Sequence, residues 1–158
     1  MIILGIDPGL ATTGIAIIET DGKTVQKADW FTIATPAHTP LSDRLSEIQE
    51  DLSAFLEGTK PDLAVVERLF FAQNEKTALD VAHARGVILL TLQSRAIPII
   101  EPTPLELKSC ITGDGKADKI QIQQMLMREL HLDEPPKPDD AADALAMALF
   151  GVFQHLKV

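Results

Sequence analysis

The sequence predicts a three-layer α/β fold, in which a mixed sheet of five strands is flanked by helices on both faces. The first third of the chain holds three strand-like runs separated by turn signals, as expected for antiparallel neighbours. The rest alternates helix, strand, helix and strand patterns and then continues as helices, which favours a layered α/β arrangement. A length of 158 residues is typical of one domain, so we expect residues 1–158 to fold as a single unit.

The strands of the first third are bounded by glycine and proline. Residues 2–6 form a continuous apolar run, which is typical of a central strand buried on both faces. Pro8-Gly9 interrupts it, and residues 15–18 resume the apolar pattern. Asp21-Gly22 predicts a hairpin turn, followed by a third strand that ends near residues 31–33.

A proline-bearing loop then leads to the first helix. Thr39 is expected to cap this helix and Pro40 to occupy its first position, because proline fits the start of a helix well. Helical spacing of apolar residues continues as far as Gly58 and is carried by Leu41, Leu45, Ile48, Leu52 and Phe55.

The later elements follow from the same signals. A fourth strand is expected at 63–66 and ends at Glu67, and a long helix is expected to run from an Asn74 cap to about Arg95. A fifth strand is expected over residues 96–100. Pro98 indicates that this strand lies at an edge of the sheet, because proline cannot donate a hydrogen bond to a neighbouring strand. Helices are expected from Thr103-Pro104 to about Gly113, over about 117–130, and from Asp139 or Asp140 to the C-terminus after a proline-rich linker.

Composition restricts the class of protein. The chain is 46% hydrophobic and 23% charged, as in ordinary globular proteins. No apolar run approaches the roughly 20 residues of a membrane span, and no basic segment precedes the first apolar run. Cys110 has no partner for an internal disulfide and is expected to be a small buried side chain, so a cytoplasmic location is predicted. The four histidines show no metal-ligand spacing and are interpreted as structural.

The net charge of −9 argues against a polyanionic partner, but the charge is uneven. Residues 1–67 carry −7 and residues 129–158 carry −4, whereas residues 68–128 carry +2. An anionic partner is therefore expected to meet the middle third of the chain.

Two carboxylates end predicted buried strands. Asp7 follows the first strand and Glu67 follows the fourth. Either residue alone could be a strand end that faces water. If the two strands are neighbours, however, the carboxylates converge, and like charges at short range need a cation between them.

The start of the last helix supplies further carboxylates. Asp140 and Asp143 share a helix face, and Asp139 with Asp143 would satisfy the geometry nearly as well. Helix capping explains Asp139 or Asp140, but it explains Asp143 poorly. An acidic cluster of this kind suits Mg²⁺ or Mn²⁺. Two such ions could bind the attacking oxygen and the leaving oxygen when a phosphodiester bond is cleaved by in-line displacement.

Four motifs together resemble the RuvC family of Holliday-junction resolvases. They are Gly5-Ile6-Asp7-Pro8-Gly9 with Thr13-Gly14, Val66-Glu67 with Phe70, Ala84-Arg85-Gly86-Val87, and Asp140-Ala141-Ala142-Asp143-Ala144-Leu145. The resemblance extends from Ile2 to about residue 150. It implies an RNase H-like fold and a homodimer that makes paired, metal-dependent nicks in four-way junction DNA, in partnership with a branch-migration helicase complex of the RuvA and RuvB type.

The resemblance also assigns residues. The catalytic and metal-binding carboxylates map to Asp7, Glu67, Asp140 and Asp143, with two Mg²⁺ ions (or Mn²⁺) per site, and this mapping selects Asp140 over Asp139. The expected DNA contacts are Phe70, Arg68, Lys108, Lys116 and Lys119. Phe70 matches an aromatic that reaches toward bases, and core packing beside Leu69 and Phe71 is the alternative.

Three other functions are compatible with parts of the sequence. The glycine-rich start also resembles sugar-kinase and actin-like ATPases, but these need two such lobes. A metal-dependent nuclease acting on RNA or RNA–DNA hybrid, similar to the YqgF family, is the nearer alternative. The third is a junction-binding module without activity, although all four acidic positions are present.

Overall fold

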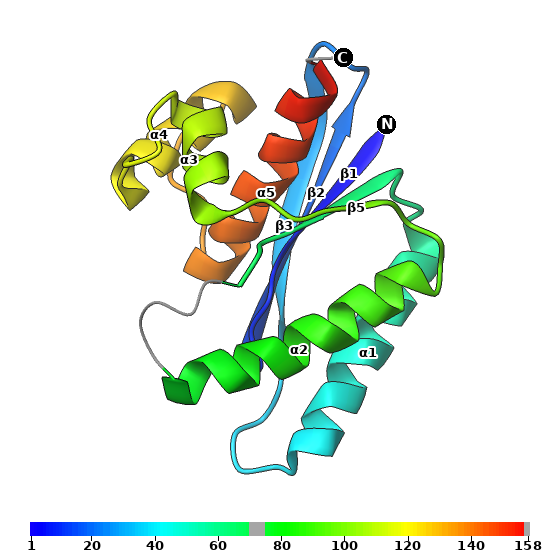
Figure 1. The fold of residues 1–158 in the computed structure, drawn as a ribbon. Helices are drawn as coiled ribbons and strands as arrows, with labels where there is room; N and C mark the ends of the chain where they lie inside the picture. The colour runs from blue at the N-terminus through cyan, green and yellow to red at the C-terminus, as the bar shows by residue number, and fades with distance from the viewer. Residues whose placement is uncertain (70–74, 157–158) are drawn as a thin grey trace.

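The computed structural model describes residues 1–69 and 75–156, which form one mixed sheet covered by helices (Figure 1). The strands are β1 (Ile2–Asp7), β2 (Thr12–Thr20), β3 (Val25–Ala34), β4 (Leu63–Val66) and β5 (Ile99–Ile100). The helices are α1 (Leu41–Gly58), α2 (Glu75–Gln93), α3 (Pro104–Thr112), α4 (Lys119–Leu130) and α5 (Asp139–Leu156).

The strand order across the sheet is β3-β2-β1-β4-β5. β1 pairs antiparallel with β2 and parallel with β4, and β5 joins β4 in parallel at the edge. The Asp21-Gly22 turn between β2 and β3 is confirmed, because the Asp21 carboxylate accepts from the Lys23 and Thr24 amides and Gly22 has a φ of 89°. The mixed sheet is therefore as predicted, with β1 at its centre.

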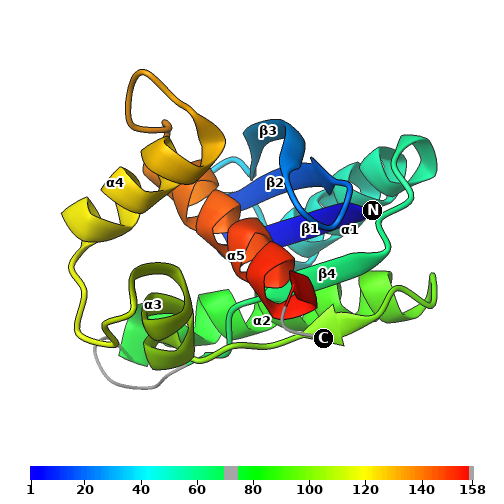
Figure 2. The ribbon, with the colours of Figure 1, turned by 90° about the horizontal axis from the view of Figure 1, so that it is seen from above.

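Helices cover both faces of the sheet (Figure 2). One hydrophobic cluster joins α3, α4 and α5 to one face, and the other joins α1 and α2 to the opposite face. None of the helices in the described part of the chain has the length and hydrophobicity that a membrane span requires.

Glycines let α5 lie directly on the central strands. A Cβ built on Gly5 would stand 2.0 Å from the carbonyl oxygen of Ala144, and one on Gly14 would stand 1.9 Å from that of Asp140. Both distances are far inside van der Waals contact, so only glycine allows the helix backbone this close to β1 and β2. The small buried alanines along α5, such as Ala141 and Ala144, serve the same close approach.

Several local predictions were wrong. Thr39 does not cap α1, because its hydroxyl donates to the Pro36 carbonyl within the preceding loop, and Pro40 stands at the cap position rather than inside the helix. The fifth strand is only Ile99–Ile100, since the chain leaves α2 through a left-handed turn at Ala96 (φ 54°).

The predicted Asn74 cap of α2 lies outside the described residues and stays a prediction.

Cys110 also differs from expectation. It is half-buried rather than fully enclosed, and it packs at the margin of the α3, α4 and α5 cluster. Its sulfur accepts a hydrogen bond from the Gln154 amide at 3.8 Å, which a residue at the edge of the core can receive from the neighbouring helix.

Candidate active site

The carboxylates of β1 and β4 leave the same end of the sheet. These strands are parallel neighbours with Ile6 opposite Val66, so Asp7 and Glu67 follow at equivalent positions. Both strands are almost fully buried, and the two acidic side chains are half-buried where the strands end. The convergence predicted for neighbouring strands is therefore found.

α5 brings the second pair of carboxylates to this end. Asp140 and Asp143 lie in its first turns, and the Asp140 main chain rests on Gly14 of β2. Asp140 and Asp143 are half-buried, whereas Asp139 is exposed. The difference arises because Asp140 and Asp143 lie on the side of α5 that contacts the sheet, whereas Asp139 does not.

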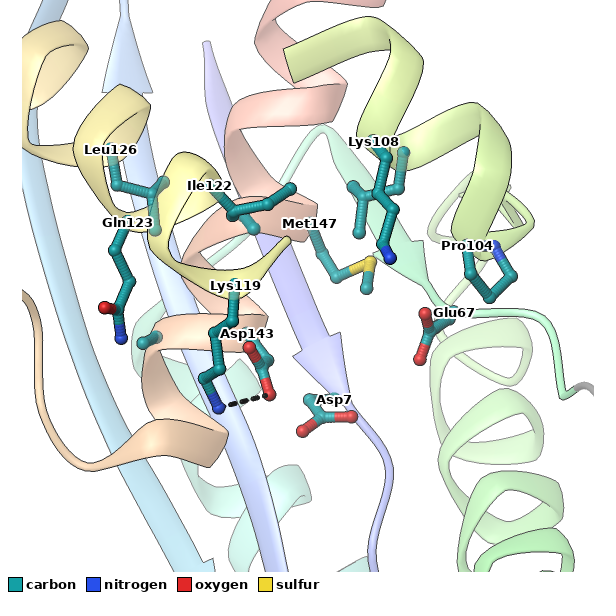
Figure 3. A pocket seen from close by; sticks show the side chains of 13 residues that line it. Asp7, Glu67, Pro104, Lys108, Lys119, Ile122, Gln123, Leu126, Asp143 and Met147 are labelled. Atoms are coloured by element: carbon teal, nitrogen blue, oxygen red, sulfur yellow. Dashed lines mark ion pairs between the residues drawn. The ribbon is translucent and has the colours of Figure 1, made fainter. Parts of the chain in front are cut away.

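A cavity of about 220 Å³ gathers most of these groups (Figure 3). Three acidic and two basic side chains line it, with apolar residues around them: Asp7, Glu67, Asp143, Lys108, Lys119, Pro104, Leu107, Ile122, Gln123, Leu126, Ala142, Ala146 and Met147. In Figure 3 the Asp7 carboxylate lies between those of Asp143 and Glu67. Asp140 does not line this cavity.

Burial and like charges raise the pKa of Asp7 to about 8. Burial is the largest cause, followed by the negative charges of Asp143, Glu67 and Asp140, while the positive charge of Lys119 acts in the opposite direction. A carboxylate with this pKa is largely protonated at neutral pH unless a cation compensates it. The site therefore favours a bound cation.

Glu67 and Asp143 are affected in the same way. Burial is the main cause of the raised pKa of each. Asp143 adds to the rise at Glu67, where the Lys108 ammonium opposes it, and Lys119 opposes the rise at Asp143. Lys108 thus partly offsets the charge of Glu67, and Lys119 partly offsets the charges of both Asp143 and Asp7.

Lys119 lies between two aspartates of α5. Its Nζ is 3.0 Å from an Asp139 carboxylate oxygen and 3.8 Å from one of Asp143. The hydrogen bond to Asp139 is the largest cause of the raised pKa of Lys119. Asp139 therefore pairs with a lysine, although its negative charge also contributes to the raised pKa of Asp143.

The remaining predicted DNA contacts are placed unequally. Lys108 faces the cavity from α3, as Figure 3 shows. Arg68 is exposed and lines an adjoining hollow that also includes Asp7 and Glu67. Lys116 is exposed in the loop before α4 and lines neither hollow. Phe70 lies outside the described residues.

Two polar residues of the site were given no role by sequence reasoning. The Arg85 Nε donates to the Glu67 carbonyl oxygen at 2.8 Å, and its Nη2 pairs with Glu101. Arg85 belongs to one of the motifs that carry the family resemblance, which was the available signal. Glu101 had none, because its importance depends on how α2 packs.

The donor chemistry of the cluster fits a hard divalent ion. All four candidates are carboxylates, which supply the oxygen ligands that Mg²⁺ and Mn²⁺ prefer. Within the described ranges, no group of three or more His, Cys, Asp or Glu side chains has the arrangement of a metal site.

Comparison with known proteins supports one family. Residues 3–151 match the family model for "Crossover junction endodeoxyribonuclease RuvC". A protein of that name from Synechococcus sp. is 47% identical over 98% of this chain and 100% of its own length, and one from Desulfitobacterium hafniense is 46% identical over 94% and 90%. Thermus thermophilus RuvC in complex with Holliday junction substrate superimposes with a TM-score of 0.89 and 28% identity, over 99% of this chain and 96% of that one.

The structural match confirms the predicted RNase H-like fold, and the family match extends over nearly the whole chain. Nuclease activity in this family depends on a metal ion, which agrees with the acidic cluster. The chain therefore belongs to the RuvC family of crossover junction endodeoxyribonucleases, which hydrolyse DNA to resolve Holliday junctions in recombination and repair.

Proposed function

We propose that Asp7, Glu67, Asp140 and Asp143 are the catalytic carboxylates and hold two Mg²⁺ ions, for which Mn²⁺ can substitute. The observation that supports this most strongly is the cavity that Asp7, Glu67 and Asp143 share with two lysines. Asp140 is included because its charge contributes to the raised pKa values of Asp7 and Asp143. Two divalent ions add four positive charges and change the formal net charge from −9 to −5.

The side chains of the site would divide the work of phosphodiester hydrolysis. The metal ions, when bound, would polarise the attacking water and neutralise charge on the scissile phosphate. Asp7 holds its ligand position at the end of a rigid central strand, which limits misplacement. Leu107, Ile122 and Met147 line the cavity with apolar atoms and reduce competing water around the charged groups.

Lys119 is proposed to bind phosphate after leaving its aspartate partners. Its ammonium pairs with Asp139 and Asp143 in the structure, so it cannot fully engage DNA at the same time. Compensation of the Asp143 charge by a cation would weaken that pairing. Lys108, which has no such close pair among the described residues, would contact phosphate from the opposite wall.

The proposed substrate is four-way junction DNA, which the Thermus thermophilus relative binds in its solved complex. Arg68 and Lys116 are proposed to extend the contacts along the strand, and Phe70 to stack on bases near the crossover. These residues belong to the only third of the chain with net positive charge. The acidic remainder would discourage binding to ordinary duplex.

We further propose that residues 1–158 act as one nuclease domain and pair as a homodimer through α2. Ile88 and Leu92 are fully buried in the chain's own core, but Leu79 and Leu90 are 63% and 70% exposed. The proposed dimer surface of α2 is therefore limited to exposed residues such as Leu79 and Leu90, although the helix contains more apolar residues than these.

A dimer also fits the reaction, because two symmetric nicks need two active sites, which a twofold dimer supplies. A helicase complex of the RuvA and RuvB type is the proposed partner.

The assignment of the carboxylates is tested with a synthetic mobile four-way junction. Asp7→Asn, Glu67→Gln, Asp140→Asn and Asp143→Asn should each lower Mg²⁺-dependent cleavage by roughly 100-fold or more. Junction binding measured in Ca²⁺ should remain near wild type. Cleavage by Asp7→Asn or Glu67→Gln at close to the wild-type rate would refute the two-metal site.

The substrate is tested in the same assay with matched duplex and RNA–DNA hybrid. We expect cleavage of the junction to exceed that of either control. Preferential cleavage of the hybrid would instead support the RNA-directed alternative.

The dimer is tested by sedimentation at tens of micromolar protein with junction present. Leu79→Asp combined with Leu90→Asp should shift the protein toward monomer, whereas Leu105→Asp, a 64% exposed leucine on α3, should not. A wild-type protein that remains monomeric on the junction would refute the dimer.

A further inference from the structure

Glu67 lies immediately beyond the regular hydrogen bonding of the sheet. β4 ends at Val66, which is the last residue of that strand registered with β1, and the ladder to β5 ends one residue earlier at Val65. The strand ladder therefore does not fix the peptide that follows Glu67. Something else must fix the direction in which its carboxylate leaves the backbone.

Both polar atoms of the Glu67–Arg68 peptide are held by other segments. The Glu67 carbonyl oxygen accepts from Arg85 Nε at 2.8 Å, and the Arg68 amide donates to the Pro102 carbonyl at 2.9 Å. These partners come from α2 and from the segment between β5 and α3. The peptide plane is thereby fixed from two sides at the point where the strand ladder has ended.

Arg85 is itself fixed in place. Its guanidinium also pairs with Glu101, and only 14% of its side chain is exposed. A planar guanidinium donates along defined directions, so one group can hold two acceptors in a set relative geometry. Glu101 also compensates the positive charge, which makes burial of Arg85 beside the site less costly.

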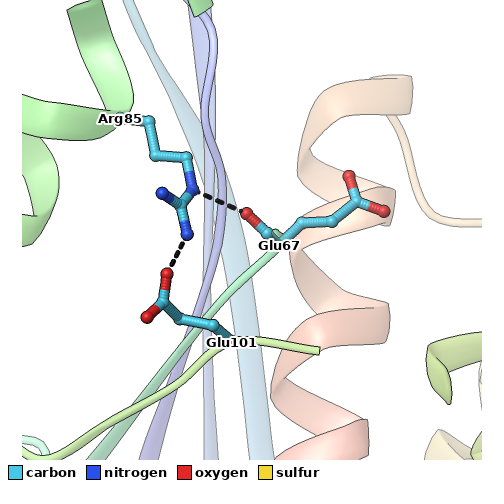
Figure 4. A network of polar contacts seen from close by, with 3 residues as sticks. All are labelled: Glu67, Arg85 and Glu101. Carbon is cyan, nitrogen blue, oxygen red and sulfur yellow. Dashed lines mark hydrogen bonds and ion pairs between the residues drawn. The ribbon is translucent and has the colours of Figure 1, made fainter. Parts of the chain in front are cut away.

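The contact acts on the main chain and not on the carboxylate. In Figure 4 the Glu67 carbonyl points toward Arg85, while its side chain extends away toward α5. The causes of the raised pKa of Glu67 are burial and Asp143, opposed by Lys108, and Arg85 is not among them. Arg85 therefore affects where the Glu67 carboxylate lies more than how readily it ionises.

We propose that Arg85, held by Glu101, is a positioning residue for Glu67 and sets the metal affinity of the site. The inference rests on the proposed role of Glu67 as a metal ligand. Groups that orient a ligand typically change metal affinity by 10–100-fold when they are removed. A contribution to folding alone would instead lower the melting temperature without changing the affinity of the folded protein for metal.

The test measures Mn²⁺ binding to the full chain without DNA, by electron paramagnetic resonance. Arg85→Ala should weaken binding of the ion at Glu67 by about 10–100-fold. Arg85→Lys should give an intermediate loss, because an ammonium cannot reproduce the guanidinium fork. Glu101→Gln should weaken binding least, since its amide oxygen can still accept from Arg85.

Arg95→Ala is the matched control. Arg95 lies just after the end of α2, and its guanidinium donates to the Thr91 carbonyl oxygen at 3.4 Å. The residue therefore matches Arg85 in side-chain chemistry, but its hydrogen bond is to α2 itself and not to Glu67. Its Mn²⁺ affinity should equal that of the wild type. Junction cleavage gives a second measurement: for Arg85→Ala, the Mg²⁺ concentration for half-maximal rate should rise by the same factor as the loss in Mn²⁺ affinity.

The outcomes separate this inference from the proposed function. Unchanged Mn²⁺ affinity in both Arg85 variants, with Glu67→Gln defective, would overturn the positioning role and leave the carboxylate site intact. Unchanged Mn²⁺ binding in Glu67→Gln would overturn the proposed function itself. If Arg85→Ala does not fold, Arg85→Lys and Glu101→Gln decide the question by the same measurement.

Discussion

The two faces of the sheet differ in how closely a helix backbone approaches the strands. Against α1 and α2, large aliphatic side chains fill the space, and Ile48, Leu52, Ile88 and Leu92 are all fully buried there. Against the start of α5, main chain meets main chain, because glycines at positions 5 and 14 leave no side chain between. The α5 face carries Asp140 and Asp143, whereas the face covered by α1 and α2 contributes Arg85 from its margin.

This difference shows how the fold combines stability with placement. Side chains that fill volume can rearrange around a substitution, so the face covered by α1 and α2 should tolerate changes at a cost in stability. Backbone contact has no such freedom, and any added atom must move the helix. The acidic residues of α5 are therefore positioned by the less adaptable of the two faces.

Among the variants that test the difference between the two faces, Gly14→Ala is expected to have the largest effect. The added Cβ would stand 1.9 Å from the Asp140 carbonyl oxygen, so the start of α5 must shift. Misplacement of about 1 Å can reduce a rate by roughly 100-fold, and overpacking costs about 1–3 kcal/mol. Single-turnover cleavage and thermal unfolding measure the two effects.

Gly58→Ala is the control for this variant. Gly58 ends α1 and has no heavy atom of a neighbouring segment within 4 Å of a built Cβ. It should cleave at the wild-type rate. Equal cleavage by Gly14→Ala would contradict the importance of close packing at α5.

Ile88→Ala, on the face covered by α1 and α2, should lower stability strongly and cleavage only slightly. Ile88 is fully buried on α2, and removing most of its side chain leaves a cavity that costs about 2–5 kcal/mol. Cleavage per folded molecule should stay within a few-fold of wild type, measured well below the melting temperature. A loss of cleavage as large as that of Gly14→Ala would show that both faces position the site equally.

The acidic cluster should also make stability depend on pH in the absence of metal. The pKa of Asp7 is about 8 in the folded protein, against 3.8 for an unperturbed aspartate, so the folded state binds more protons between these limits. Stability should then fall by about 1.4 kcal/mol per pH unit as pH rises through this window, and be regained on acidification.

Asp7→Asn should flatten that dependence, and saturating Mg²⁺ should oppose it by compensating the ionised carboxylate. Melting temperatures in EDTA between pH 5 and pH 8 provide the measurement. Glu67 and Asp143 act in the same direction, since burial raises the pKa of each. A wild-type protein that becomes more stable toward pH 8 without metal would contradict the assignment.

The smallest effect is expected at the surface lysines. Junction affinity should fall less steeply with salt for Lys119→Ala than for the wild type. The negative slope of log affinity against log salt concentration should become shallower by about 0.9, because one phosphate contact is lost. Lys27→Ala, which removes an exposed lysine paired with Asp29 on β3, should leave the slope unchanged. Equal slopes for Lys119→Ala and wild type would place Lys119 outside the DNA contact.

Much of the fold could be predicted because its signals are local. The buried run at residues 2–6, the Asp21-Gly22 turn and the helical spacing before Gly58 each depend on residues close together in the chain, and all three elements are present. Predictions failed where a distant or competing partner decided the outcome. The Thr39 hydroxyl donates to the Pro36 carbonyl instead of capping α1. Residue 96 closes a turn out of α2, so the fifth strand begins only at Ile99.

The candidate site divides in the same way. The sequence alone indicated a cluster of carboxylates, because acidic residues at the ends of buried strands need a compensating charge. The basic residues expected beside it followed from the family resemblance. Only the tertiary structure decided that Lys119 pairs with Asp139, that Lys108 faces the cavity while Lys116 does not, and that Arg85 holds the Glu67 carbonyl. The Arg85–Glu67 and Lys119–Asp139 contacts join residues that are 18 and 20 positions apart in the chain. They depend on how the helices pack on the sheet and leave no periodic pattern in the sequence.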